Sequence, residues 1–226
     1  MFGYSQLPQL TKNLIIINLI VFLALSIHPI LYNYLSLYYF SNELFQPWQI
    51  VTHMFSHASF MHLFFNMFAL WMFGSVLEQV LGPKRFLTFY LITGFGGAIL
   101  HLLVNITEIY SLSGQISITS LEAINALSIS YSDKIIIRDL IFTPMVGASG
   151  AIFGVLIGFA FFFPDARLML IFPPIPIKAK VLVTILIIFE LYSGYQRAGN
   201  IAHFAHLGGA LFGYFILKSW KRRGIL

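Results

Sequence analysis

The amino-acid sequence predicts an all-α membrane protein with six transmembrane helices in a single domain, residues 1–226. Apolar residues make up 58% of the chain and charged residues only 9%, whereas about a quarter of a typical soluble domain is charged. Several apolar stretches approach the roughly 20 residues that a helix needs to cross the hydrocarbon core. No hydrophilic block is long enough to form a separate soluble domain.

Six stretches qualify as spans, with approximate ends. In chain order they are Asn13–His28, Phe60–Leu81, Phe86–Val104, Met145–Phe163, Ala179–Tyr195 and Ile201–Trp220. The first could be mistaken for a signal peptide, because Ala24-Leu25-Ser26 faintly resembles a cleavage site. The six-span topology needs this helix, however, so we expect it to be retained. Because it starts so early, we expect no transit peptide ahead of it.

The connecting segments differ in character. Gly82-Pro83 ends the second span, and prolines within 164–176 fill the turn before the fifth, because proline cannot continue a helix. The segment 31–59 is rich in aromatic residues, which suits the lipid–water boundary. The segment 105–143 is polar enough to be exposed, and we expect it to be partly helical around Ser120–Leu127.

The basic residues predict the orientation. If the chain crosses six times, 10 of the 13 Lys and Arg residues lie on one side: Lys12, Lys84, Arg85, Arg167, Lys178, Lys180, Lys218, Lys221, Arg222 and Arg223. The positive-inside tendency places that side, with both termini, in the cytoplasm. We expect a bacterial plasma membrane. The basic residues form no long stripe, so the net charge of +5 indicates topology and no nucleic-acid partner.

Three polar clusters lie near the outward-facing ends of even-numbered spans, where each suggests a function because unpartnered polar groups in a membrane are costly. The first is Gly147-Ala148-Ser149-Gly150, which opens the fourth span and is followed by Gly154 and Gly158. Taken alone, the glycines indicate a close-packed helix seam, and a serine there can cap the helix. Ser149 nevertheless lies near enough to the outer boundary for water to reach it.

The second cluster contains His203 and His206 in the sixth span. Gly209 and Gly213 follow His206 by three and seven positions and share its helix face. We therefore expect His206 to face the close-packed seam and His203 to lie beside it, nearer the surface. A lone histidine would indicate a hydrogen-bonded packing residue. Together with Ser149 on another glycine-lined helix, it favours a nucleophile and its base.

The third cluster provides hydrogen-bond donors. His62 and Asn66 are four residues apart and project from one face of the second span. Two donors on one face suit a developing oxyanion, and they also suit an interhelical hydrogen bond. We expect nearby His53 and His57 to be structural.

These residues together predict a serine hydrolase site. Serine is a poor nucleophile until a base removes its proton, and the neutral imidazole of His206 can act as that base. Glu190 and Glu78 look misplaced for orienting His206, so a two-residue dyad is predicted. The Ser149 backbone N–H and the His62 and Asn66 side chains are the candidates for binding the oxyanion.

At these residues the chain resembles the rhomboid family of intramembrane serine proteases. The likeness covers His53 through Gly213 and rests on the motifs at 62–66, 147–150 and 205–213, which stand in the family's order. It implies a six-helix rhomboid-like bundle with a water-filled cavity open to the non-cytoplasmic side. The implied roles are nucleophile for Ser149, base for His206 and oxyanion binding for His62 and Asn66. Five residues are expected to support the site: Gly147, Gly150, Phe153, Gly209 and Gly213.

The resemblance also implies the substrate: single-span membrane proteins, cleaved in or beside the transmembrane segment where their helix unwinds easily. The chain departs from the family at Phe153, where many members have Tyr packing on the histidine, and at Trp48-Gln49, where Trp-Arg is common. The outer segment 105–143 also looks longer than in minimal members.

We expect no cofactor and no metal. The absence of cysteine excludes thiolate catalysis and Cys-based metal sites. Two other functions would fit parts of the sequence. A proteolytically inactive relative could bind or escort transmembrane helices, but such proteins generally lack the serine or the histidine. A metal transporter could use the histidines, but it would need intramembrane carboxylates along a pathway, and Glu190 is the only one well inside a predicted span.

Overall fold

The computed structural model describes residues 7–169, 174–196 and 203–226 as a mostly helical chain. Six helical stretches correspond to the six predicted spans: α1 (Gln9–Ile27), α4–η2–α5 (Phe60–Leu81), α6 (Pro83–Ser113), α9 (Ser149–Phe162), α10 (Ala179–Tyr195) and α11 (His203–Arg222). The second stretch is one helical path that widens into a π-helical turn, η2 (Leu70–Gly74), between α4 (Phe60–Ala69) and α5 (Ser75–Leu81). The predicted start of the last span, Ile201, lies outside the described residues.

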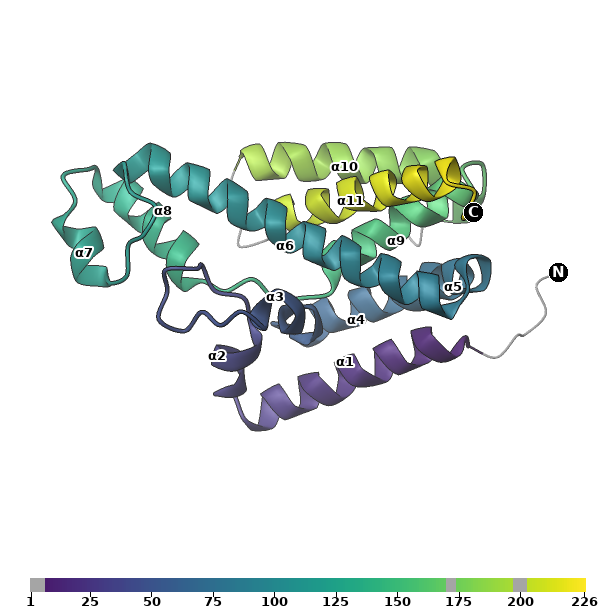
Figure 1. Cartoon of the computed structure of the whole chain (residues 1–226), viewed down its shortest axis with the longest axis horizontal. Coiled ribbons are helices and arrows are strands. Elements are labelled where there is room, and N and C mark those ends of the chain that lie inside the picture. The colour runs from purple at the N-terminus through teal and green to yellow at the C-terminus, as the bar shows by residue number, and fades with distance from the viewer. Residues whose placement is uncertain (1–6, 170–173, 197–202) are drawn as a thin grey trace.

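The helices of the bundle differ in length, from 14 residues in α9 to 31 in α6. Within the described residues, three stretches are long and apolar enough to cross a membrane: Gln9–Ile27, Phe60–Leu81 and Pro83–Ser113. The 14-residue helix α9 is shorter than a lone span requires. It packs against both α6 and α11, and α1 begins and α11 ends at the same end of the bundle (Figure 1). The all-α membrane fold is thus as predicted, with six helical stretches compatible with six crossings.

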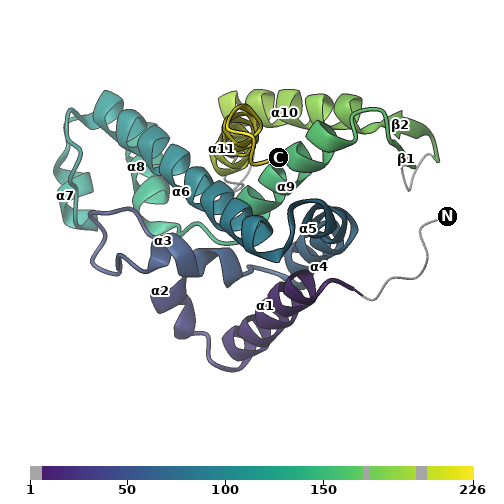
Figure 2. The ribbon, with the colours of Figure 1, turned by 45° about the vertical axis from the view of Figure 1, so that its right-hand side comes forward.

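Helices α6, α9 and α11 meet through glycines; the sequence predicted this seam for α9 and α11, and the structure adds the glycines of α6. A β-carbon at Gly97 would lie 2.7 Å from the carbonyl oxygen of Ala205, and one at Gly208 would lie 2.6 Å from that of Gly96. At Gly209 a β-carbon would overlap the backbone carbonyl of Gly150. The backbones therefore approach as closely as small residues permit. Figure 2 looks almost along α11, with α6, α9 and α10 around it.

The outer segment 105–143 contains more helix than the sequence analysis expected. Helix α6 continues beyond Val104 to Ser113, and α8 (Tyr131–Phe142) was not predicted, whereas α7 (Leu121–Ala126) matches the expected helix. The Ser130 side chain accepts a hydrogen bond from the Asp133 N–H and so caps α8. Together α7, α8 and the end of α6 form a lobe at one end of the molecule (Figure 1). A separate apolar core fills it: Tyr39, Ile109, Ile118, Ile124, Ile137 and Ile141.

The remaining elements lie in the connectors. The first connector, between α1 and α4, contains three short elements: α2 (Leu31–Leu35), α3 (Gln49–Thr52) and the 3₁₀ turn η1 (His53–Phe55). Before α10, the proline-rich connector forms an antiparallel pair of strands, β1 (Arg167–Met169) and β2 (Pro176–Lys178), where only a turn was expected. Hydrogen bonds from Lys180 and Lys178 lower the pKa of Asp165 beside this pair.

Glu78 attaches α1 to the bundle. Helix α1 follows Pro8 and has no side-chain cap of its own. The Glu78 carboxylate accepts hydrogen bonds from the N–H groups of Leu10 (3.1 Å) and Thr11 (2.7 Å) and from the Thr11 hydroxyl (2.7 Å). A carboxylate at a helix N-terminus satisfies free N–H groups and interacts favourably with the helix dipole. Glu78 thus caps α1 from a different helix.

We expect Glu78→Gln to lower the free energy of unfolding by about 2 kcal/mol, because hydrogen bonds to a charged acceptor are stronger than those to an amide. Unfolding in mixed detergent micelles measures this change. The control is Gln9→Ala, which removes an exposed side chain from the same helix end. If Glu78→Gln and Gln9→Ala were equally stable, the capping role would be refuted.

Candidate active site

Ser149 and His206 meet across two helices. Ser149 is the first residue of α9, and His206 lies in the first turn of the described part of α11. The Oγ atom of Ser149 lies 2.7 Å from Nε2 of His206, within hydrogen-bond distance. With the ring proton on Nδ1, Nε2 accepts the hydroxyl proton, which is the arrangement that nucleophilic attack by serine requires.

The loop before α9 sets the direction of Ser149. Gly147 has φ of 113°, which residues with a β-carbon rarely adopt, and its N–H donates to the His53 carbonyl at 2.9 Å. A β-carbon here would also lie 2.6 Å from ring atoms of His62. Gly147 therefore allows both the turn into α9 and the approach of the His62 ring.

The candidate oxyanion donors are not equally placed. His62 lies against Gly147, two residues before Ser149. Asn66, one turn further along α4, is buried, and its amide donates to the carbonyl of His62 at 2.9 Å. The Ser149 N–H lies in the first turn of α9, where backbone donors have no partner within the helix. The structure thus brings His62 and the Ser149 backbone to one place, while the Asn66 amide bonds within its own helix.

His53 and His57 line the outer side of the site. The Nδ1 atom of His53 lies 2.9 Å from the Gln49 carbonyl, and Nε2 of His57 lies 3.5 Å from the Ala148 N–H. Burial, with a smaller contribution from His62, lowers the pKa of His57 to about 4, so its ring is neutral. These contacts fit the structural roles expected for both residues.

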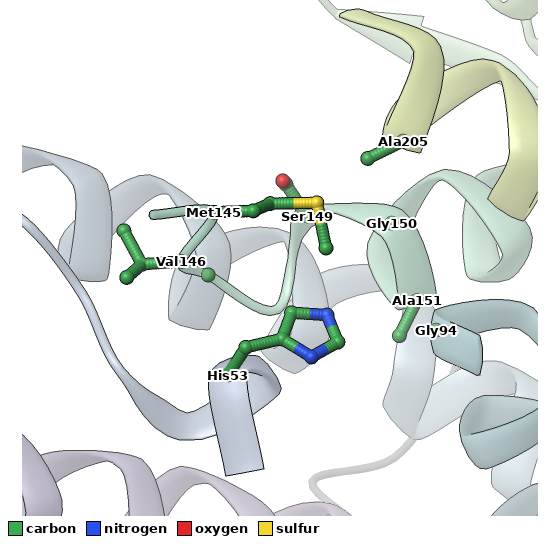
Figure 3. A pocket seen from close by; sticks show the side chains of 9 residues that line it. His53, Gly94, Met145, Val146, Ser149, Gly150, Ala151 and Ala205 are labelled. Atoms are coloured by element: carbon green, nitrogen blue, oxygen red, sulfur yellow. The ribbon is translucent and has the colours of Figure 1, made fainter. Parts of the chain in front are cut away.

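A small cavity adjoins the serine. Figure 3 shows the His53 ring on one side of it and Ser149, Met145 and Ala205 on the other. Its lining residues are His53, Gly94, Met145, Val146, Gly147, Ser149, Gly150, Ala151 and Ala205. The space holds about one water molecule. Sequence analysis did not place His53 beside the serine, because only the folded loop brings them together.

Glu190 corrects two expectations. It was thought misplaced for orienting His206, yet its Oε1 atom lies 3.0 Å from Nδ1 of His206. Its Oε2 atom lies 2.6 Å from Nδ1 of His203, which was expected nearer the surface and is in fact buried. The error arose because the relative rotation of α10 and α11 decides which faces meet, and no sequence spacing reveals it. The available signal was the cost of a carboxylate inside a span.

Comparison with known proteins identifies the family. A rhomboid domain model matches residues 44–220, well over half of the chain. This chain belongs to the rhomboid family. It is 30% identical over 178 residues to "Rhomboid protein 1, mitochondrial" of Saccharomyces cerevisiae, covering 77% of this chain and 43% of that protein.

Two further relatives with rhomboid names have similar identity to this chain. "RHOMBOID-like protein 12, mitochondrial" of Arabidopsis thaliana is 31% identical over 161 residues, covering 71% of this chain and 43% of that protein. "Presenilin-associated rhomboid-like protein A, mitochondrial" of Danio rerio is 27% identical over 229 residues, covering 98% and 51% respectively. The chain therefore spans about half the length of these relatives, or less.

Phe153, which stands where many rhomboids have tyrosine, still makes a ring contact with His206. Phe153 stacks on His206, with ring centroids 4.5 Å apart and an angle of 6° between the planes. It lies four residues after Ser149 and so on the same face of α9. Stacking restricts rotation of the imidazole while its Nε2 atom remains beside the serine.

One group in the described part of this rhomboid chain could offer three metal ligands. The nitrogen and oxygen donors of Glu190, His203 and His206 all lie within 4.8 Å of one another. Two nitrogens and one carboxylate would suit zinc. Nε2 of His206 faces the serine, and Nδ1 of each imidazole lies within 3.0 Å of a Glu190 oxygen, so these groups already contact protein atoms directly.

Proposed function

We propose that this protein is an intramembrane serine endopeptidase that cleaves transmembrane or juxtamembrane segments of single-span membrane proteins. Ser149 acts as the nucleophile and His206 as the base. Membership of the rhomboid family supports an intramembrane protease function. The observation that carries the assignment is the 2.7 Å distance between Ser149 Oγ and His206 Nε2, from two helices that start at the same end of the bundle.

The chemistry follows from these atoms. As Oγ attacks the scissile carbonyl carbon, its proton passes to Nε2 and the carbonyl π electrons move to oxygen. The Ser149 N–H, with the His62 and Asn66 side chains as further donors, stabilises that oxyanion. When the C–N bond breaks, His206 returns the proton to the leaving nitrogen, and water then releases the acyl group by the same steps in reverse. The steps use only groups of the protein chain and water.

Water and an unwound substrate must both reach the serine for the proposed reaction. Ser149 and His206 are partly buried near the starts of their helices, and the side chains of His53 and Ser149 supply polar atoms to the adjoining cavity. A substrate helix must first unwind, because its peptide groups are otherwise occupied by their own hydrogen bonds. We propose that substrates are cut where small or helix-breaking residues make unwinding easy.

We propose that residues 1–226 form a single domain whose site opens on the side opposite the basic connectors, with the termini on the basic side. The protein is an integral membrane protein. All three relatives carry mitochondrial names, which weakens the expectation of a bacterial plasma membrane.

A fluorophosphonate probe tests this function directly. We expect the purified protein to be labelled at Ser149, because only an activated serine hydroxyl attacks the probe. Labelling should disappear in Ser149→Ala and fall by at least about 100-fold in His206→Ala, which removes the base. Folded wild-type protein that resists the probe and cleaves no membrane-anchored reporter would refute the protease and favour a helix-binding protein.

A further inference from the structure

We propose that Glu190 is a positioning residue for His206, so that Ser149, His206 and Glu190 act as a hydrogen-bonded series. The inference rests on the proposed function and deepens it. It replaces the expected dyad by a site in which a carboxylate on a third helix, α10, holds the base.

The carboxylate lies between two imidazoles. Its Oε1 atom lies 3.0 Å from Nδ1 of His206 and its Oε2 atom 2.6 Å from Nδ1 of His203. The side chains are 8% exposed for Glu190, 12% for His206 and 5% for His203. Water therefore has little access to these contacts, so electrostatic interactions among them are only weakly screened.

The contact with His206 is close but is not yet a well-aligned hydrogen bond. Within the part of the chain that the structure describes, the buried Nδ1 atom of His206 has no aligned hydrogen-bond partner. The nearby Oε1 atom is an acceptor that a small rotation of the ring or carboxylate would align. Catalytic hydrogen bonds are often poorly aligned without substrate and tighten in the complex. A buried donor next to an acceptor at 3.0 Å is thus poised to form one.

A carboxylate at this place supports the reaction in two ways. It favours the tautomer with the proton on Nδ1, which leaves Nε2 free to accept the Ser149 proton. After that transfer the imidazolium is positive, and the adjacent carboxylate stabilises it inside the bundle. Glu190 stays ionised throughout, and the proton remains on His206 until the leaving nitrogen takes it from Nε2.

His203 holds the carboxylate in position. Its Nδ1 atom can donate to Oε2, so one oxygen is anchored while the other faces His206. A carboxylate within a membrane span needs such a partner. Phe153 restrains the His206 ring from one face, and Glu190 approaches its Nδ1 edge. Together they restrict both the plane of the ring and its rotation.

Glu190→Gln tests the role, because it keeps the shape of the side chain and removes its charge. Using a membrane-anchored reporter and purified full-length protein, we expect kcat to fall by about 100-fold or more with KM nearly unchanged. Labelling of Ser149 by a fluorophosphonate should slow by a similar factor. Glu190→Asp, which retains the carboxylate, should recover part of the loss.

The matched control is Glu78→Gln, which removes another buried carboxylate by the same substitution, remote from the site. It should lower stability while leaving kcat per folded molecule unchanged. A second pair of variants tests the same role in case Glu190→Gln does not fold. His203→Phe removes the side-chain donor to Oε2, whereas His203→Gln retains a side-chain N–H donor. We expect His203→Phe to lose about tenfold more kcat than His203→Gln, since misplaced catalytic groups cost this much or more.

The inference is overturned if wild-type protein is labelled and active while Glu190→Gln keeps its kcat within about threefold, a change too small for lost transition-state stabilisation. It is also overturned if Glu190→Asp and Glu190→Gln lose activity only in proportion to folded protein, or if His203→Phe and His203→Gln behave alike. In those cases the proposed function stands. If wild-type protein is neither labelled nor active, the proposed function fails, and this inference fails with it.

Discussion

Ser149→Ala should abolish cleavage of a membrane-anchored reporter, with kcat reduced by about 10⁴-fold or more. The substitution removes the oxygen proposed to attack the substrate and should leave the helices unchanged, because Ser149 lies at the start of α9 and gives no side-chain cap. The Ser149 hydroxyl lies 2.7 Å from His206 Nε2. Without this hydroxyl, no oxygen at this place can form the proposed acyl-enzyme bond. Cleavage is measured by quantifying the released fragment in detergent or in liposomes.

The control is Ser26→Ala. Ser26 is an exposed helical serine whose hydroxyl donates to the Phe22 carbonyl at 2.8 Å in α1, so the substitution deletes the same atom far from the site. We expect full activity in this variant. Retention of turnover by Ser149→Ala, with a fragment of unchanged length, would exclude Ser149 as nucleophile.

The second large effect is structural: Gly209→Ala should lower the free energy of unfolding by about 3 kcal/mol, the upper part of the range for overpacked cores. A β-carbon there would overlap the backbone carbonyl of Gly150 on α9, which cannot move aside as a flexible side chain could. The two helices must separate to admit it. Unfolding in mixed detergent micelles measures the loss of stability.

A graded series makes the result specific. At Gly213 the same β-carbon would lie 3.1 Å from Gly154 Cα, a milder conflict, so Gly213→Ala should destabilise the protein less than Gly209→Ala does. Leu211→Ala, at a side chain 47% exposed on the same helix, should be the mildest of the three. A reversed order, or a fully stable Gly209→Ala, would contradict the glycine seam.

Gly209→Ala should also reduce activity in the fraction that remains folded. Gly150 adjoins Ser149, and Gly209 lies one turn beyond His206, so separating α9 from α11 lengthens the Oγ–Nε2 distance. A misplacement of about 1 Å can cost about 100-fold in rate. The small residues of the motifs would thus serve the proposed reaction by allowing Ser149 and His206 to approach each other.

The sequence by itself determined the membrane class, most of the helical stretches and the meeting of Ser149 with His206. Phe60–Leu81 and Ala179–Tyr195 have their predicted bounds because long apolar runs between charged or proline-containing connectors leave little choice. The spacing between His206 and Gly209 predicted that His206 faces the glycine seam, because residues that share a face of one helix can be read from their spacing alone. These are features that neighbouring residues encode.

Only the tertiary structure decided which helices face each other. Glu190 and His203 belong to α10 and α11, and nothing in either stretch specifies their relative rotation, which side-chain packing sets. For the same reason α8 was missed: its isoleucines become a core only against Ile109 and Tyr39, far away in the chain. Local pattern thus determined the spans and the two residues proposed to react, whereas the packing of one helix against another decided the position of the carboxylate beside them.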